Sequence, residues 1–405
     1  MKDSDIKIYG YRWVVLFVFA IINAVVQIQW LTFAPIAGAA QSVYNVSALQ
    51  IDFLSMIYMI VFIILCIPAS YIIDTYGIRI GIGFGAILAG ISGLLKGIYA
   101  TDYTMVCIAQ IGLAISQPFV LNAITKVGVR WFPINERATA AGIGALAQYI
   151  GIVVVMIATP NMISMDANGK YNISDMLMTY GIITAVGALL LLIFLREKPE
   201  TPPCLEGQDD RIQVFAGLKH IFKNRDMLLL LLVFFIGLGM FNAISTCIEQ
   251  ICKLKGLNFE QSGLVGGIML IGGVFGASIL PPLSDKFRKR KIFIVICVAC
   301  MIPGIAGLAF ASSYWLLLVS ATIFGFFLMA VGPIGFQYSA EISAPAPEST
   351  AQGLILLAGQ ISGIVFVFGM NRIGMIPFMV FFIVCSAVCF FLCTMLKESP
   401  MITAG

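Results

Sequence analysis

The feature that most constrains this chain is the recurrence of long apolar runs along its 405 residues. A helix that crosses a bilayer needs about 20 predominantly apolar residues, and the first run, WVVLFVFAIINAVV, is followed by many others of that kind. Their lengths predict an all-α polytopic membrane protein with twelve spans, at roughly 12–38, 51–73, 79–100, 104–127, 138–160, 176–195, 227–251, 262–283, 291–311, 314–336, 350–371 and 374–396.

Composition supports this class and excludes others. Hydrophobic residues make up 60% of the chain and charged residues 11%, whereas a soluble protein usually has about 25% charged residues. The net charge of +4 lies in short loops, which does not indicate nucleic-acid binding. The ten cysteines lie mostly in apolar runs and form no zinc or disulfide pattern. We therefore expect no nucleic acid, no metal and no cofactor.

The basic residues predict the orientation. Of the 24 lysines and arginines, 19 fall in one set of loops and termini, four fall on the other side, and Lys96 falls within a span. Because basic residues favour the cytoplasmic side, both termini are expected in the cytoplasm of an integral protein of the plasma or inner membrane. Lys96 lies toward the outer end of its span, where we expect it to extend its ammonium to the interface.

Two landmarks predict an internal repeat. Asp74, Gly77 and Arg79 follow the second span, and a related loop with Asp285 and Arg290 follows the eighth, 211 residues later. The entries to spans 5 and 11, PINERATAAGIGALAQYIGI and PAPESTAQGLILLAGQISGI, match at an offset of 212. We expect two pseudo-symmetric six-helix halves, 1–195 and 226–405, joined by a cytoplasmic linker, 196–225, that contains an amphipathic surface helix.

Parallel six-span halves are typical of the major facilitator superfamily, and the loop after span 2 resembles its D-R-x-G-R-[RK] motif. Asp74, Gly77 and Arg79 keep that motif, and its second copy keeps Asp285 and Arg290 but has Arg288 in place of the glycine. The resemblance implies a gate, in which a carboxylate at a helix end pairs with an arginine across the two halves. The simpler alternative is that these charges only set topology.

Polar residues within the spans indicate where a substrate would bind, because such side chains in hydrocarbon usually face a cavity or the bundle interior. Gln29 and Trp30 lie about eighteen residues into span 1, and the 211 offset places Phe241 at the same depth, beside Asn242. Gln148 and Gln360 form a second symmetric pair. We expect these residues to line a central cavity. The alternative for each is packing, or a hydrogen bond to a neighbouring helix worth about 1 kcal/mol.

The predicted cavity is rich in aromatic rings and amides and has no carboxylate near its centre. Aromatic faces bind quaternary ammonium groups with about 0.5–2 kcal/mol per ring. The pattern favours a transporter that moves a small organic cation by alternating access, without proton coupling. Asp52 and Glu249, toward the outer ends of spans 2 and 7, are the proton sites of the coupled alternative.

Stretches along the whole chain resemble the feline leukaemia virus subgroup C receptor family of choline and ethanolamine transporters, also proposed as haem exporters. They include RWVVLFVF, WFPINE, FNAISTCIEQ and GPIGFQYSAEISAP. The resemblance implies that Trp30 and Gln360 bind the substrate ammonium. The family's span 7 tyrosine falls on Asn242, and its span 5 Asn-Gln pair falls on Gln148 and Tyr149, so the predicted cage is altered.

Several alternatives remain beside a choline-like or other amine substrate. They are proton-coupled transport of an organic anion, a vitamin or a drug, and haem export. His220, the single histidine, lies in the predicted linker helix, away from the spans, where it suits a haem ligand poorly. An enzyme is not expected, because no catalytic motif is present, and short loops argue against a receptor. We expect a monomer that contacts a small-molecule substrate and the lipid bilayer.

Overall fold

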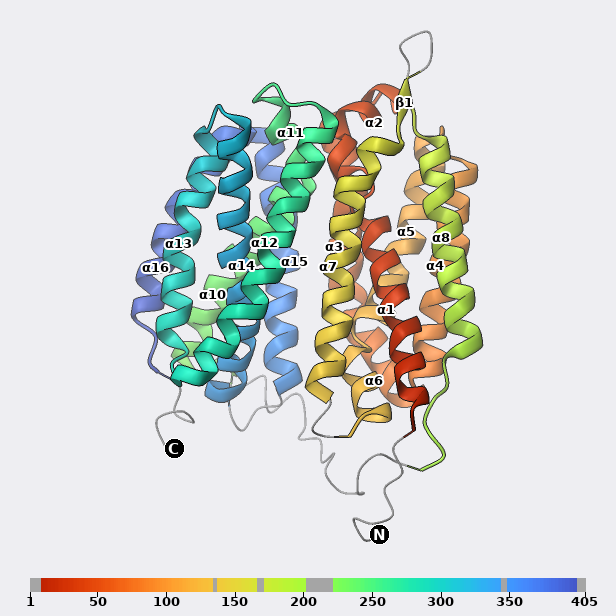
Figure 1. The fold of residues 1–405 in the computed structure, drawn as a ribbon, viewed down its shortest axis with the longest axis horizontal. Coiled ribbons are helices and arrows are strands. Elements are labelled where there is room, and N and C mark those ends of the chain that lie inside the picture. The colour runs from red at the N-terminus through yellow and green to blue at the C-terminus, as the bar shows by residue number, and fades with distance from the viewer. Residues whose placement is uncertain (1–8, 134–136, 166–170, 202–220, 344–347, 399–405) are drawn as a thin grey trace. The chain divides into compact units, whose positions relative to one another are not determined.

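A computed structural model describes residues 9–133, 137–165, 171–201, 221–343 and 348–398 (Figure 1). Within these residues, twelve helices are long and apolar enough to cross a membrane, which confirms the predicted number. The chain divides into two compact units, Met1–Asp209 and Asp210–Gly405. The amphipathic helix expected in the linker falls mostly on 202–220, outside the described residues.

The first unit contains one short two-stranded hairpin and is otherwise helical over its described residues. Its elements are α1 (Tyr11–Trp30), the 3-10 helix η2 (Ala34–Ile36), α2 (Ala37–Tyr44), α3 (Ala48–Tyr76), α4 (Ile78–Ile98), α5 (Tyr103–Leu121), α6 (Ile124–Trp131), α7 (Arg137–Met162), β1 (Ser164–Met165), β2 (Tyr171–Asn172) and α8 (Ser174–Phe194). The antiparallel strands pair Ser164 with Asn172.

The second unit repeats the order of the six membrane-spanning helices. Its elements are α10 (Arg225–Thr246), α11 (Ile248–Lys253), α12 (Phe259–Phe287), α13 (Lys291–Phe310), α14 (Tyr314–Ser343), α15 (Glu348–Ile373) and α16 (Met375–Thr394). Helix α12 begins 211 residues after α3 (259 against 48), and α14 begins 211 residues after α5 (314 against 103). The helix boundaries therefore confirm the duplicated half that the two loop motifs predicted.

Capping side chains explain where several helices begin. Ser47 and Gln50 form a capping box at α3, and the Asp102 carboxylate accepts from the backbone N–H groups of Thr104 and Met105 at α5. Asn224 caps α10 in the same way. These groups satisfy N–H donors that have no partner within the helix.

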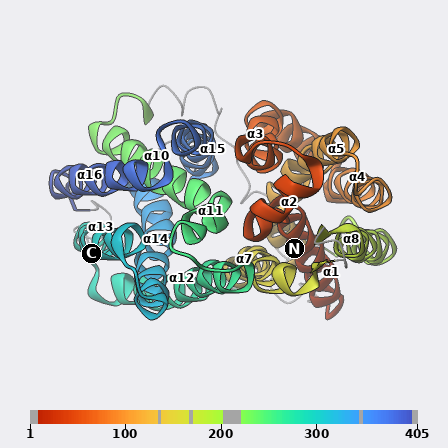
Figure 2. The same ribbon diagram turned by 90° about the horizontal axis from the view of Figure 1, so that it is seen from above.

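Within each unit the helices pack through close backbone contacts. Helix α4 lies between α5 and α8, and α14 lies between α12 and α13 (Figure 2). A Cβ placed on Gly181 of α8 would lie 2.5 Å from the Gly93 carbonyl oxygen of α4, so only a residue without a side chain allows this approach. Small residues at such crossings are typical of helices that associate in membranes.

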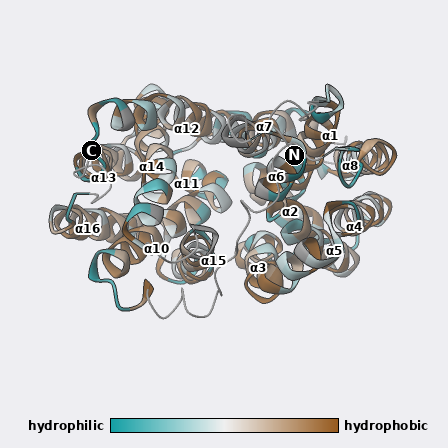
Figure 3. Ribbon diagram, turned by 90° about the horizontal axis from the view of Figure 1, so that it is seen from below, coloured by the Kyte–Doolittle hydropathy of each residue, from teal (hydrophilic) through white to brown (hydrophobic). Residues whose placement is uncertain are grey.

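The outward faces of the helices suit a lipid environment. Large apolar side chains such as Ile67 and Phe391 are 77% and 67% exposed. Figure 3 shows hydrophobic residues dominating the helices, with hydrophilic residues gathered near helix ends and in connections. Exposed apolar surface of this extent marks a membrane-facing protein.

Span 1 differs from its prediction as one continuous run over 12–38. Helix α1 ends at Trp30, residues 31–33 form a turn, and the span continues through η2 and α2 to Tyr44. Pro35 lies at the start of η2, where its missing N–H and fixed φ oppose an uninterrupted α-helix. The break places the end of a helix within the span, beside the residues predicted to bind substrate.

Candidate functional site

The last four carbonyl oxygens of α1 have no hydrogen-bond donor within the helix. Each of them accepts a hydrogen bond from a group outside it. Gln27 O accepts from the backbone of Leu31, and Ile28 O accepts from the Thr32 hydroxyl at 2.8 Å. Trp30 O accepts from the Ser55 hydroxyl at 3.3 Å. In hydrocarbon no water could replace these donors, so neighbouring helices complete the broken end of α1.

The remaining carbonyl, Gln29 O, receives the most unusual donor, the ammonium of Lys96 in α4. Lys96 Nζ lies 3.2 Å from Gln29 O, 3.0 Å from Gln29 Oε1 and 3.1 Å from the Thr32 hydroxyl. The ammonium also lies 4.9 Å from the ring centroid of Phe33. The lysine is 0% exposed, so the prediction that it extends to the membrane interface is wrong.

The physical reason is that an ammonium has three donors and the broken helix offers three oxygens within reach. The C-terminal end of a helix also carries partial negative charge, which favours a cation there. Among the described residues, no carboxylate lies within ion-pair distance of Lys96. The positive charge of Lys96 is therefore stabilised by the dipoles of three oxygen atoms and by the Phe33 ring.

Both polar atoms of the Gln29 side-chain amide form hydrogen bonds in this arrangement. Its Oε1 accepts from Lys96, and its Nε2 donates to the Thr184 hydroxyl of α8 at 2.9 Å. The backbone oxygen also accepts from Gln110 Nε2 of α5 at 3.3 Å. Gln29 is 0% exposed, and in this structure its amide supports the helix break.

Trp30 is held on the other side of the break by α3. Its Nε1 donates to the Ser55 carbonyl oxygen at 3.2 Å, while the Ser55 hydroxyl donates back to Trp30 O. This reciprocal pair fixes the indole against one turn of α3. The side chain is 7% exposed.

In the second unit, the structure brings together residues that sequence analysis placed on different spans. Asn242 of α10 donates from Nδ2 to the carbonyl oxygen of Gly359 in α15 at 3.2 Å. Gly359 directly precedes Gln360, and Phe241 directly precedes Asn242. The predicted pairs from spans 7 and 11 thus meet at one helix contact.

Gln148 and Gln360 are the symmetric amides on α7 and α15, and both are partly exposed. In the described part of the chain, neither side-chain amide hydrogen-bonds to another residue, and the same is true of the Tyr149 hydroxyl. Amides without partners are costly inside a span. These are therefore the predicted site residues whose polar atoms remain available to a ligand.

At the α3–α4 junction, Gly77 adopts a left-handed φ of +93°, which favours glycine. The Glu197 carboxylate, just after α8, accepts from the backbone N–H of Arg79 at 2.8 Å. A Cβ on Gly77 would also lie 2.5 Å from Glu197 Cδ. The predicted gate glycine thus makes room for a carboxylate that caps α4. The side chain of Asp74 lies outside the described part of the structure.

The α12–α13 junction has the same design and adds a buried ion pair. The Glu398 carboxylate accepts from the backbone N–H groups of Arg290 and Lys291 at 2.7 and 3.1 Å. The Arg290 guanidinium lies 3.1 Å from Glu341 Oε1 and also donates to Ser284. Arg290 and Glu341 are 7% and 6% exposed. Arg290 thus pairs with a carboxylate of its own unit, and the Asp285 side chain is not among those described.

Sequence analysis missed Glu197 and Glu398, although a signal for them was present. Each directly follows a leucine and a basic residue just beyond the sixth helix of its unit, as Leu195-Arg196-Glu197 and Leu396-Lys397-Glu398. Their separation of 201 residues equals that between the starts of α8 and α16 (375 against 174). A search restricted to one offset near 211 could not find them.

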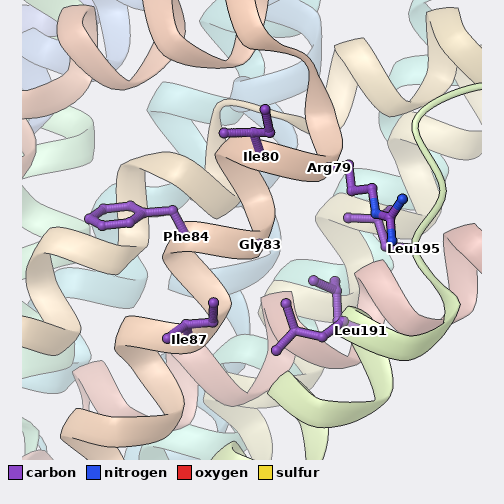
Figure 4. A pocket seen from close by; sticks show the side chains of 8 residues that line it. Arg79, Ile80, Gly83, Phe84, Ile87, Leu191 and Leu195 are labelled. Carbon is purple, nitrogen blue, oxygen red and sulfur yellow. The ribbon is translucent and has the colours of Figure 1, made fainter.

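A shallow groove of about 360 Å³ lies between α4 and α8 (Figure 4). It is lined by Arg79, Ile80, Gly83, Phe84, Ile87, Leu191, Leu192 and Leu195. Apart from Arg79, it contains none of the residues predicted to bind substrate or act as a gate, and its walls are apolar. The described residues contain no group of three or more His, Cys, Asp or Glu side chains arranged to hold a metal, and His220 lies outside them.

Comparison with known proteins gives consistent relatives. The sequence profile of the Major Facilitator Superfamily matches residues 13–367. Solute carrier family 49 member A3 of Danio rerio is 29% identical over 87% of this chain and 77% of its own length. The choline/ethanolamine transporter FLVCR2 of Rattus norvegicus is 26% identical over 92% of this chain and 71% of its own.

Solved structures show the same fold. A bacterial homologue of the human lysosomal transporter Spinster superposes with a TM-score of 0.77 at 14% identity, covering 96% of this chain and 98% of its own. A D-xylose–proton symporter superposes with a TM-score of 0.72 at 16% identity, covering 96% and 99%.

Proposed function

Because this chain belongs to the Major Facilitator Superfamily and is a membrane transporter, we propose that it carries a small organic cation of the choline or ethanolamine type by facilitated alternating access. Relatives named for choline and ethanolamine transport match across about nine-tenths of the chain. The names of these relatives suggest the substrate class. The amide and aromatic side chains of this chain are the kind that bind a cation.

The observation that carries the proposal is the pair of unpartnered amides, Gln148 and Gln360, at equivalent positions of the two units. An amide oxygen and an aromatic ring both attract a cation without themselves being charged. Trp30, Phe241, Asn242 and Tyr149 complete the proposed binding residues, and Gln29 acts behind them by holding the end of α1.

The proposed gate uses the two helix junctions. We propose that Asp74, Gly77, Arg79, Asp285 and Arg290 control access from the cytoplasmic side, where the distribution of basic residues predicts both termini. Glu197 and Glu398 join this group, because each caps the helix that begins at the corresponding junction.

Uptake in proteoliposomes tests the substrate class. We expect saturable uptake of radiolabelled choline or ethanolamine by the wild type, unaffected by a pH gradient. Trp30→Ala should raise KM by about 2- to 30-fold, the range that corresponds to one lost cation–π contact. The matched control is Trp315→Ala, because Trp315 is 75% exposed on α14 and should leave uptake unchanged.

Two results would contradict this proposal. Absence of wild-type uptake of both amines would reject the cation class, and organic anions, vitamins, drugs and haem would then be screened in the same vesicles. Uptake driven by a proton gradient would support the second candidate, a proton-coupled carrier. The observation that favours this second candidate is the buried ammonium of Lys96, a titratable group inside a span.

A further inference from the structure

Lys96 is a fully buried charged side chain of the first unit, and the proposed function gives it no role. Charged groups within a membrane usually mark functional sites. Lys96 is 0% exposed, and its ammonium makes three hydrogen bonds, to Gln29 O, Gln29 Oε1 and the Thr32 hydroxyl. Since an ammonium has three hydrogens, no donor is left for a substrate.

The placement of these acceptors shows what the lysine controls. Gln29 directly precedes Trp30, and Thr32 follows it by two residues, so one ammonium binds the chain on both sides of the tryptophan. Ser55 holds Trp30 itself from α3. The direction in which the indole leaves the backbone is therefore set by α3 and α4 together.

The chemistry of the site resembles a cation site. Transporters with broken helices use the C-terminal ends of half-helices and unwound carbonyl groups to coordinate Na⁺. Here the oxygens at the broken end of α1 surround the Lys96 ammonium, and the Phe33 ring lies 4.9 Å away. The Lys96 ammonium thus contacts oxygens of the kind that bind a metal cation at such a helix end.

We propose that Lys96 is a positioning residue, a built-in cation that fastens the broken end of α1 and thereby orients Trp30 for substrate. The proposal rests on the proposed function for its consequence in transport, but the position of Trp30 is measurable without substrate. Lys96 does not touch the substrate itself, because it is enclosed on all sides.

A variant in which Trp30 is the single tryptophan tests the placement directly. The chain has four tryptophans, and Trp13, Trp131 and Trp315 are replaced by phenylalanine. In this background, Lys96→Met keeps a similar length but removes the charge and its hydrogen bonds. We expect the emission of Trp30 to shift to longer wavelength and its quenching by acrylamide to increase, in the absence of any substrate.

The matched control is Lys255→Met. Lys255 also donates from Nζ to a carbonyl oxygen at a helix end, that of Ala309, but it belongs to the second unit. It should leave the Trp30 emission unchanged. Lys96→Arg keeps a positive donor and should restore part of the wild-type spectrum, which a loss of general packing would not explain.

Uptake measurements then separate the two proposals. For Lys96→Met we expect KM for choline to rise by about 2- to 30-fold, the range of the cation–π contact that a misplaced Trp30 loses, with a smaller change in the maximal rate. If the wild type takes up neither choline nor ethanolamine, the proposed function fails, while the fluorescence still decides the role of Lys96.

Unchanged emission, quenching and KM in Lys96→Met would overturn the inference. If Lys96→Met does not fold, Lys96→Gln provides the same test, because it removes the charge but keeps a polar side chain with hydrogen-bond donors. A smaller shift in the same direction would support the proposal, and no shift would overturn it.

Discussion

Gln29 and Lys96 show how two polar residues within spans can satisfy each other across 67 positions of the chain. Sequence analysis recognised Gln29 and Trp30 as unusual because amides are rare in an apolar run. It placed Lys96 at the interface because the residue lies near a helix end, where long side chains usually reach water. The error arose because the acceptors belong to another helix, and nothing local to α4 reveals them.

The buried pair of Arg290 and Glu341 gives a prediction at this scale. Glu341→Ala removes the carboxylate that lies 3.1 Å from the buried Arg290 guanidinium, and we expect this to cost about 3–5 kcal/mol of stability. The measurement is thermal or denaturant unfolding of the detergent-solubilised protein, followed by intrinsic fluorescence.

Glu260→Ala is the matched control for that carboxylate, because Glu260 is exposed in the first turn of α12. It should cost less than about 1 kcal/mol. Equal losses in the two variants would show that the Arg290–Glu341 contact contributes no more than an ordinary surface charge.

Among the elements, the number of helices and their repeat were predictable, and the break in span 1 was not. The length of each apolar run can be read from the sequence, so the number of membrane-spanning segments and their order can be predicted. The turn at 31–33 is as apolar as its flanks, and the carbonyl groups of Gln29 and Trp30 just before it are satisfied by residues of α3, α4 and α5. Pro35 was a local signal, but it does not specify where the helix ends.

The approach of α4 to α8 depends on glycine and gives a prediction for these elements. In Gly181→Ala, the new Cβ would lie 2.5 Å from the Gly93 carbonyl oxygen, so the two helices must separate. We expect a loss of about 1–3 kcal/mol, as for other overpacked sites, seen as a lower melting temperature.

Gly332→Ala in α14 is the control for this helix crossing. A Cβ there meets no atom within 4 Å, and alanine favours a helix by up to about 1 kcal/mol over glycine. Its melting temperature should stay the same or rise. A similar fall in both variants would assign the effect to the helices alone rather than to their contact.

For the whole molecule, the two units share a framework but differ in where they carry charge. At the offset of 211, Arg130 of the first unit corresponds to Glu341 of the second. At offsets of 211 to 213, Lys96 corresponds to the uncharged residues Gly307, Leu308 and Ala309. The arrangement of helices could be predicted from the sequence because it occurs twice. The roles of charged residues such as Lys96 could not, because they have no counterpart in the other unit.

The built-in ammonium leads to a prediction for transport as a whole. Because Lys96 already binds the oxygens at the broken end of α1, we expect the wild type to need no Na⁺. Uptake should be the same when Na⁺ is replaced by N-methylglucamine, at constant osmolarity. A requirement for Na⁺ would show that a metal cation binds elsewhere or displaces the lysine.

The position of Lys96 also bears on biosynthesis. A charged residue raises the free-energy cost of inserting a span into a bilayer. For α4 this cost arises while the rest of the chain is still being made. Its acceptors, Gln29 and Thr32, and the ring of Phe33 all precede it in the sequence. The groups that bind the ammonium are therefore synthesised before Lys96 itself. Gln110 and Thr184, which hydrogen-bond to Gln29, are synthesised afterwards.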